Sequence, residues 1–171
     1  MAALEMRSKR SGQAAIEFAL LYGAVILPLL FGTVFVAEMY WVWHSMVEFT
    51  RDGARYAATH CWQSDNQNVL GYMQSHVPRV IDQNQFQVGG SAQIVVEYFQ
   101  HDPDSGQLVS FAGCSADCAV SCVPDAVTIS VTNYQFSRFV NLVKLPPVVL
   151  PAFPTSMPIE SNGCDQDGNC Q

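Results

Sequence analysis

The feature that most constrains this chain is a basic N-terminal cluster followed by a long uncharged apolar run. Arg7, Lys9 and Arg10 precede the run, and no residue from Phe18 to Ala37 carries a charge. These 20 residues are the length that a helix needs to cross a bilayer with a hydrocarbon layer about 30 Å thick. Because basic residues that flank a span stay in the cytoplasm, we expect everything after the run to lie outside the cytoplasm.

The apolar run differs from an ordinary signal peptide. Signal peptides have a shorter apolar core that ends in a small-residue cleavage site. Here the run continues into Glu38 and an aromatic cluster of Tyr40, Trp41 and Trp43, which suits a membrane–water interface. If a segment is removed, we therefore expect it to be the basic leader, cut at the cytoplasmic face.

Three sequence blocks, in this order, resemble the TadE-like family. They are Ser-Gly-Gln-Ala-Ala-Ile-Glu-Phe-Ala-Leu at 11–20, Leu-Pro-Leu-Leu-Phe-Gly at 27–32 and Thr-Arg-Asp-Gly-Ala-Arg-Tyr-Ala-Ala at 50–58. Proteins of this family are minor pilins, or pseudopilins, of the tight-adherence (Flp, type IVc) pilus machinery. The exit region with Trp41, Trp43 and His44 is bulkier than that pattern, and no family motif follows the third block.

The resemblance implies a processing site and a domain plan. A prepilin peptidase would cut after Gly12, so that residues 1–12 form the leader and Gln13 begins the mature chain. Residues 13–61 would form the N-terminal helix, with the membrane span at about 18–37. Residues 62–171 would form a periplasmic or extracellular domain above the inner membrane. The implied role is structural, in starting or capping an adhesive pilus, with no enzyme activity and no cofactor.

Glu17 is the acidic residue that stands just before the span, and it has two interpretations. After cleavage, the new ammonium of Gln13 lies one helical turn from it, and a glutamate in a packed bundle could neutralise the ammonium of another subunit. The resemblance assigns Glu17, followed by Phe18, this role in assembly. The alternative is an interfacial acid near the headgroups, where its cost is modest.

The excess of acidic side chains restricts the classes of partner that the chain can bind. Without residues 1–12 the chain has 5 basic and 14 acidic side chains, a net charge of −9. Such a chain is unsuited to nucleic acid, which requires basic patches, and to electrostatic docking on anionic lipid. The expected partners are the prepilin peptidase, other pilin-like subunits, the inner-membrane assembly platform and the lipid around the helix.

All six cysteines follow the apolar run, which predicts disulfides in an oxidising compartment. Six cysteines allow 15 connectivities. We expect a local pair near the C-terminus and a second bond from the helix end to the central triplet. The triplet spacing fits neither a zinc site nor a C-x-x-C redox motif, but a metal or redox role remains the alternative. The cysteines are Cys61, then the triplet Cys114, Cys118 and Cys122, then Cys164 and Cys170.

Periodicity predicts an α+β fold. A helix from Ala14 to His60 would be about 70 Å long, with Pro28 as either an ordinary kink or a point where the helix can stretch. One face carries a heptad-like stripe, so its second half must pack against the outer domain or a neighbouring helix. The stripe consists of Phe35, Met39, Val42, Met46, Phe49, Gly53, Tyr56 and His60.

The rest of the chain predicts a small antiparallel sheet. A short amphipathic helix should cover residues 69–77, and strands should cover 92–99, 108–111 and 127–131, with a hairpin turn at 102–106. The proline-rich end from Pro146 to Pro158 permits at most an edge strand.

Catalytic motifs are absent from the sequence. The four histidines fall on different predicted elements; they are His44, His60, His76 and His101. The acidic turn at 165–169 resembles the start of a calcium loop but cannot complete one, because the twelfth ligand position lies beyond Gln171. Two rival interpretations remain: an uncleaved membrane-anchored ligand-binding protein, and an anchored redox enzyme that uses Cys114 and Cys118.

Overall fold

The computed structural model describes residues 2–62, 67–113, 122–138, 140, 144 and 146–159. The chain forms two compact units, Met1–Tyr40 and Trp41–Gln171, which we call the N-terminal unit and the outer unit. The prediction of an N-terminal helix followed by an antiparallel sheet is confirmed, and the fold is α+β.

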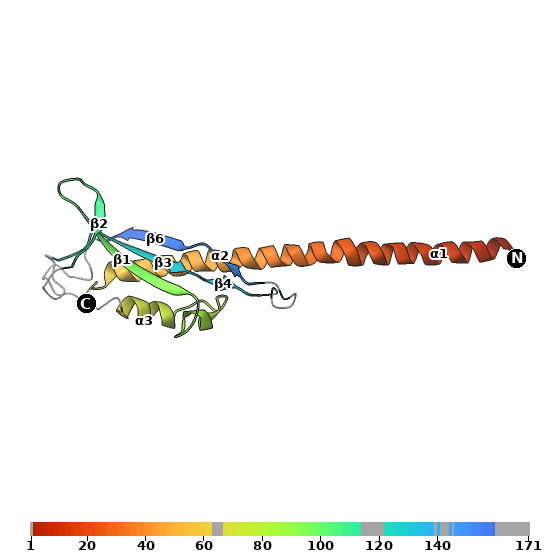
Figure 1. Cartoon of the computed structure of the whole chain (residues 1–171), viewed down its shortest axis with the longest axis horizontal. Coiled ribbons are helices and arrows are strands. Elements are labelled where there is room, and N and C mark those ends of the chain that lie inside the picture. Colours follow the sequence, from red (N-terminus) through yellow and green to blue (C-terminus); the bar gives the residue numbers. More distant parts are fainter. Residues whose placement is uncertain are drawn as a thin grey trace. The chain divides into compact units, whose positions relative to one another are not determined.

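The N-terminal unit is helical throughout its described part (Figure 1). It contains α1 (Ala2–Leu21), the π-helical segment η1 (Tyr22–Ile26) and the beginning of α2 (Leu27–Thr59). Within Gly12–Thr59 an 18-residue window has a mean hydropathy of 2.3, and none of it is buried in the structure. By length and composition this helix can cross a membrane. Its exposed large apolar side chains include Ile16, Phe18, Leu20, Leu21, Val25, Leu29, Leu30, Phe31 and Val34.

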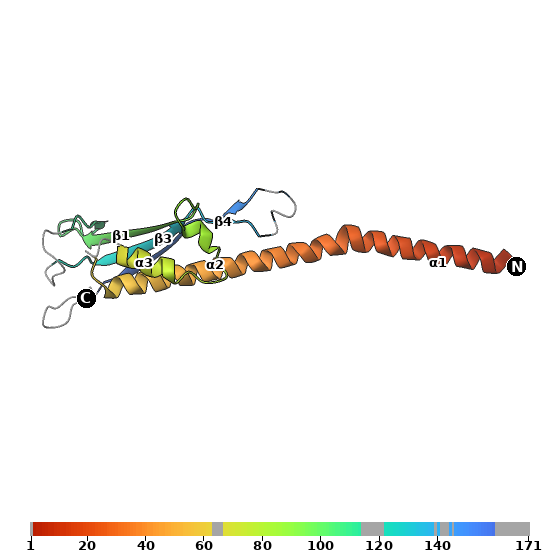
Figure 2. The ribbon, with the colours of Figure 1, turned by 90° about the horizontal axis from the view of Figure 1, so that it is seen from below.

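The η1 segment lies directly before Pro28. The backbone N–H of Leu27 donates to the carbonyl oxygen of Tyr22, five residues back instead of the four of an α-helix. Proline has no backbone N–H, so the hydrogen-bond ladder is already interrupted at the next position. The helix changes direction around this segment (Figure 2). A locally altered backbone therefore lies in the middle of the apolar run.

The outer unit contains a four-stranded antiparallel sheet in the order β2–β1–β3–β6. The strands are β1 (Gln93–His101), β2 (Leu108–Ser110), β3 (Ala126–Thr132) and β6 (Phe153–Pro158). The predicted hairpin is confirmed: β1 and β2 pair, and the N–H of Gly106 donates to the carbonyl of Asp102 at 2.8 Å. Gly106 has φ +66°, a conformation that favours glycine.

The central strand β3 supplies the middle of the core. Val127, Ile129 and Val131 are fully buried and alternate with partly exposed residues, as predicted. Beside it, β6 is the edge strand that the proline-rich end permits. The N–H of Ile159 donates to the carbonyl of Asp125. Backbone hydrogen-bonding groups alternate along a strand, so those of the even-numbered positions of β6, among them Pro154 and Pro158, point to the free edge of the sheet.

The second half of α2 packs on the sheet through the predicted stripe. Val42, Met46, Phe49 and Gly53 are buried, whereas Tyr56 and His60 at the end of the stripe remain partly exposed. Thr50, Ala54 and Ala57 are buried as well, and the stripe did not include them. A helix on a sheet buries a wider face than the seam of a coiled coil, which explains the difference. The expected i,i+3 ion pairs are present, Glu48–Arg51 at 2.8 Å and Asp52–Arg55 at 3.4 Å.

The short helix α3 (Gln67–Ser75) confirms the predicted amphipathic helix and packs against α2 (Figure 1). Gly53 permits this close approach, because a Cβ built there would lie 2.6 Å from Sδ of Met73. Tyr56 and Tyr72 also stack across the two helices at 4.0 Å between ring centroids.

Three short elements have no counterpart in the prediction: the 3-10 turn η2 (Gln83–Phe86) and the paired strands β4 (Gln135–Phe136) and β5 (Val148–Val149). Gln85 connects η2 with β4. Its side-chain amide donates to the carbonyl of Gln135 at 2.7 Å and accepts from the N–H of Gln135 at 2.8 Å.

The two cysteines in the described part of the chain, Cys61 and Cys122, are buried and disulfide-bonded. The indole N–H of Trp62 donates to the carbonyl of Cys122 at 2.9 Å, so the end of α2 lies beside the segment that enters β3. Cys114, Cys118, Cys164 and Cys170 lie outside the described residues, as does the acidic turn, and the pairing stays a prediction.

Candidate processing and assembly site on the N-terminal helix

The predicted processing site lies on an exposed helical surface. Gly12 and Gln13 belong to α1, and both residues are exposed. A Cβ built at Gly12 would meet no atom within 4 Å. A larger side chain at this position therefore meets no steric obstacle within this chain.

The structure brings Gln13 and Glu17 together. The side-chain amide of Gln13 donates to Oε1 of Glu17 at 3.3 Å, as expected for residues four apart on one helix face. Glu17 is exposed, and its hydrogen bond with Gln13 lies within the same helix face. The glutamate is therefore available to a group outside this chain, and the backbone nitrogen of Gln13 lies one turn away.

The aromatic neighbour of Glu17 continues the same surface. The rings of Phe18 and Tyr22 stack with centroids 6.3 Å apart and an interplanar angle of 23°. Both side chains are exposed, together with the apolar residues that follow. The arrangement is an acidic residue at one end of an exposed apolar and aromatic helix surface, which suits lipid or the apolar helices of neighbouring subunits.

The histidines of the outer unit form no metal site with the described residues. No group of three or more His, Cys, Asp or Glu side chains comes together there. Instead, His60 and His76 flank the stacked tyrosines, His60 on Tyr56 at 3.7 Å and His76 on Tyr72 at 4.3 Å. Sequence reasoning missed this stack, because only the packing of α3 on α2 brings the two halves together.

Folding shifts the pKa of two tyrosines and one aspartate in the outer unit. Burial raises the pKa of Tyr98 to about 12, and its hydroxyl has no hydrogen-bond partner among the described residues. Burial also raises the pKa of Tyr134. The backbone N–H of His101, followed by its side chain, holds the pKa of Asp125 below its usual value. The hydroxyl of Tyr134 accepts a hydrogen bond from the backbone N–H of Asp82 at 3.0 Å, so it connects the residue before η2 with the residue before β4.

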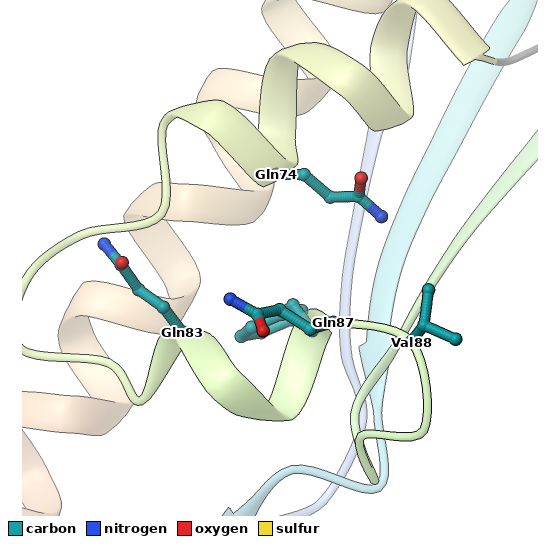
Figure 3. A pocket seen from close by; sticks show the side chains of 5 residues that line it. Gln74, Gln83, Gln87 and Val88 are labelled. Atoms are coloured by element: carbon teal, nitrogen blue, oxygen red, sulfur yellow. The ribbon is translucent and has the colours of Figure 1, made fainter.

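The described residues line two open pockets that bear on the ligand-binding alternative. One, of about 440 Å³, is lined by Gln74 on α3, Gln83 and Gln87 around η2, and by Phe86 and Val88 (Figure 3). Phe86 in its lining is buried, and its ring packs edge-on against that of Phe49 with centroids 5.7 Å apart. The other, of about 400 Å³, lies between the residues around η2 and those around β4.

Comparison with known proteins shows which part of the chain matches a known family. Residues 12–55 match the family model described as TadE-like protein. The N-terminal region is TadE-like. The resemblance inferred from the three sequence blocks is thereby confirmed, and the region includes Gly12, Glu17 and the α2 residues that pack on the sheet. No curated protein and no solved structure matches the chain.

The family links the chain with a pilus system in general, and this family is not one of enzymes. Its model ends at residue 55, so α3 and the sheet lie outside the matched region. The function of the N-terminal helix can therefore be argued from family and geometry together, whereas the outer unit has to be argued from its own structure.

Proposed function

We propose that this protein is a minor pilin or pseudopilin that a prepilin peptidase processes between Gly12 and Gln13 and that initiates or caps a tight-adherence pilus. The observation that carries the proposal is the position of Gly12, Gln13 and Glu17 on the exposed start of an apolar helix within the TadE-like region. The helix holds the protein in the inner membrane, with residues 1–12 in the cytoplasm and the outer unit beyond the membrane.

In this proposal Glu17 sets the register of assembly. Processing converts the backbone amide nitrogen of Gln13 into an ammonium. This ammonium lies one helical turn from the carboxylate of Glu17, with which the side chain of Gln13 already interacts. In a bundle of such helices, Glu17 can pair with the ammonium of a neighbouring pilin-like subunit. An ion left without a partner in this apolar setting carries a penalty of several kcal/mol, by order of magnitude, so wrongly registered neighbours are disfavoured.

The cysteines stabilise the outer unit in this proposal. Cys61 pairs with a cysteine of the central triplet and holds the end of α2 against the sheet, and Cys164 pairs with Cys170 in a short C-terminal loop. The hydrogen bond from Trp62 to Cys122 supports the first of these pairings, because it places the two segments side by side. Peptide mapping under non-reducing conditions tests both.

Processing is tested with a bulky substitution at Gly12. We expect Gly12→Leu to remain uncut and to insert normally, because the structure has open space at that position and the apolar run is unchanged. Intact mass spectrometry on membrane-extracted protein measures the leader directly. Gly23→Leu is the matched control, since its position is equally open but lies outside the site. Wild-type protein that keeps its leader in cells with an active prepilin peptidase would contradict the proposal.

Assembly is tested at Glu17. We expect Glu17→Ala to be processed and inserted but to lose pili and the recovery of pilin-like partners, and Glu17→Asp to be intermediate because its side chain is one methylene shorter. Pilus production and co-purification from detergent are the measurements. Wild-type pili with alanine at this position would show that Glu17 is only an interfacial acid.

The rival is an uncleaved anchored protein that binds a ligand in its outer unit, for which the two open pockets described above are the candidate sites. The N-terminal residue of the extracted protein separates the two functions, because only the pilin begins at Gln13.

A further inference from the structure

Two of the four arginines in the outer unit line one open pocket. The unit has 5 basic and 12 acidic side chains, a net charge of −7. Arg51 and Arg55 on α2 pair with acidic residues of the same helix. Arg79 and Arg138 instead line the pocket of about 400 Å³ between the residues around η2 and those around β4. We call it the arginine pocket; its polar lining also includes Asp82, Asn84, Tyr134 and Ser137.

A hydrogen bond of Arg138 connects the two sides of the arginine pocket. Its Nη2 donates to the backbone carbonyl of Val80 at 2.9 Å, and Val80 directly follows Arg79 in the chain. The guanidinium of Arg138 therefore lies beside the segment that carries the other arginine. Both arginines are exposed, so a ligand can reach them. A guanidinium is a planar fork of N–H donors that matches a carboxylate or another oxyanion.

A buried hydroxyl adds a donor to the lining. Tyr134 is 3% exposed, and its oxygen accepts a hydrogen bond from the backbone N–H of Asp82 at 3.0 Å. A hydroxyl has one hydrogen to donate besides its lone pairs, so this bond leaves the hydrogen for a different acceptor. Burial raises the pKa of Tyr134, so the hydroxyl keeps that hydrogen at neutral pH. A carboxylate in the pocket supplies an acceptor for it.

The acidic residue of the lining is held in a fixed position. Oδ1 of Asp82 accepts from the N–H of Asn84 at 3.1 Å, and Oδ2 accepts from the side-chain amide of Gln85 at 3.3 Å. Each carboxylate oxygen has two lone pairs, so each can also accept from a ligand hydroxyl. Gln85 bonds with Gln135 in both directions, which connects the η2 side of the pocket with the β4 side. The lining is therefore preformed, as small-molecule sites usually are.

We propose that the arginine pocket binds a small carboxylic acid that carries hydroxyl groups, with the size and chemistry of an acidic monosaccharide. The carboxylate pairs with Arg79 and Arg138 and accepts from the hydroxyl of Tyr134. The ligand hydroxyls bond with Asp82 and Ser137. Small-molecule sites have volumes of about 300–1,000 Å³, and the arginine pocket, at about 400 Å³, suits a ligand of this size.

Binding at this pocket is independent of processing and assembly, because every residue of the lining belongs to the outer unit. A processed pilin and an uncleaved anchored protein can both carry such a site. The N-terminal residue separates those two functions, whereas the test of the pocket measures a ligand.

The test is a saturation-transfer NMR titration of the full-length protein in a detergent without a sugar headgroup. Glucuronate is the probe. Glucose is the neutral control, with the same ring and no carboxylate, and inorganic phosphate is added as a competing oxyanion. We expect saturable binding of glucuronate, and binding of glucose and of phosphate that is weaker by about tenfold or more, because each lacks one half of the expected contacts.

Variants of one arginine locate the binding. Arg79→Gln should weaken the binding of glucuronate about tenfold or more, because it removes a charge-assisted contact. Arg79→Lys should be intermediate, since lysine keeps the charge and loses the planar fork. Arg51→Gln is the matched control, an arginine of the same unit that is paired with Glu48, and it should leave the affinity unchanged. Near-ultraviolet circular dichroism shows that each variant is folded.

Three results would overturn the inference. The first is no saturable binding of glucuronate to the folded wild-type protein. The second is an affinity for glucose or phosphate equal to that for glucuronate. The third is binding that Arg79→Gln leaves intact or that Arg51→Gln weakens equally. Intact mass spectrometry of the same preparations tests processing separately, and a retained leader would contradict the proposed function while leaving the result for the pocket unchanged.

Discussion

Gly53 is the position where a single methyl group should have the clearest effect on stability. A Cβ at this position would lie 2.6 Å from Sδ, 2.9 Å from Cε and 3.1 Å from Cγ of Met73. Met73 is fully buried, so its side chain can yield only by repacking against its neighbours in the core. We therefore expect Gly53→Ala to push α3 away from α2 or to force Met73 into a strained rotamer.

The magnitude follows from two opposing terms. Replacing glycine by alanine in a helix gains about 0.5–1 kcal/mol of folding free energy, whereas overpacking a well-packed site costs about 1–3 kcal/mol. Gly71 on α3 is the matched control, because a Cβ at that position meets nothing within 4 Å. Gly71→Ala has only the gain in helix stability. The difference in the free energy of unfolding between Gly71→Ala and Gly53→Ala therefore measures the cost of crowding against Met73, at about 1–3 kcal/mol.

The assay is thermal unfolding of the full-length protein in detergent, followed by near-ultraviolet circular dichroism with the disulfides intact. For a unit of this size, about 1 kcal/mol corresponds to a shift of about 3–5 °C in Tm. In a Met73→Ala background Gly53→Ala should become neutral or stabilising, since the added methyl then fills space. Equal Tm shifts for the variants at Gly53 and Gly71 would refute the close packing of α2 and α3.

Two further predictions concern the sheet. Tyr98→Phe should raise the free energy of unfolding by about 1 kcal/mol, because it removes a buried hydroxyl that has no partner among the described residues, and a lower Tm for this variant would contradict that. The pKa of Asp125 is held below its usual value by hydrogen bonds from His101, so the carboxylate stabilises the folded state above the unfolded pKa of about 3.9, and this contribution is lost as the pH falls through the folded pKa. Asp125→Asn should therefore lower Tm more at pH 7 than at pH 2, and a Tm difference that does not depend on pH would count against the carboxylate's role.

The elements that the sequence predicted are those in which local pattern and tertiary environment agree. The strand β3 alternates between buried and partly exposed residues because β1 and β6 pair with its two edges while α2 packs on one face of the sheet, so burial follows the period of the strand. The β1–β2 hairpin follows from Gly106, whose positive φ closes the turn. The edge position of β6 follows from its prolines, which cannot donate to a second neighbour.

The elements that the sequence did not predict are too short for a period or depend on distant partners. β4 and β5 have two residues each; β4 is held by the hydrogen bonds of Gln85 with Gln135, and β5 pairs with β4. The π-helical segment η1 gives the region before Pro28 a specific backbone form that proline alone does not specify. Thr50 is polar, yet it is fully buried because its hydroxyl meets that of Thr155.

The TadE-like region serves both assembly and the stability of the fold, and single variants can separate these two roles. Its first part, which includes Gly12 and Glu17, is exposed, so a change there should affect processing or assembly while Tm stays constant. Its last part, from Val42 to Gly53, forms the buried face of α2, so a change there lowers stability first. Loss of pili alone does not distinguish the two causes. Loss of pili with an unchanged Tm assigns a residue to assembly, and on that criterion Glu17→Ala and Gly53→Ala should fall on opposite sides.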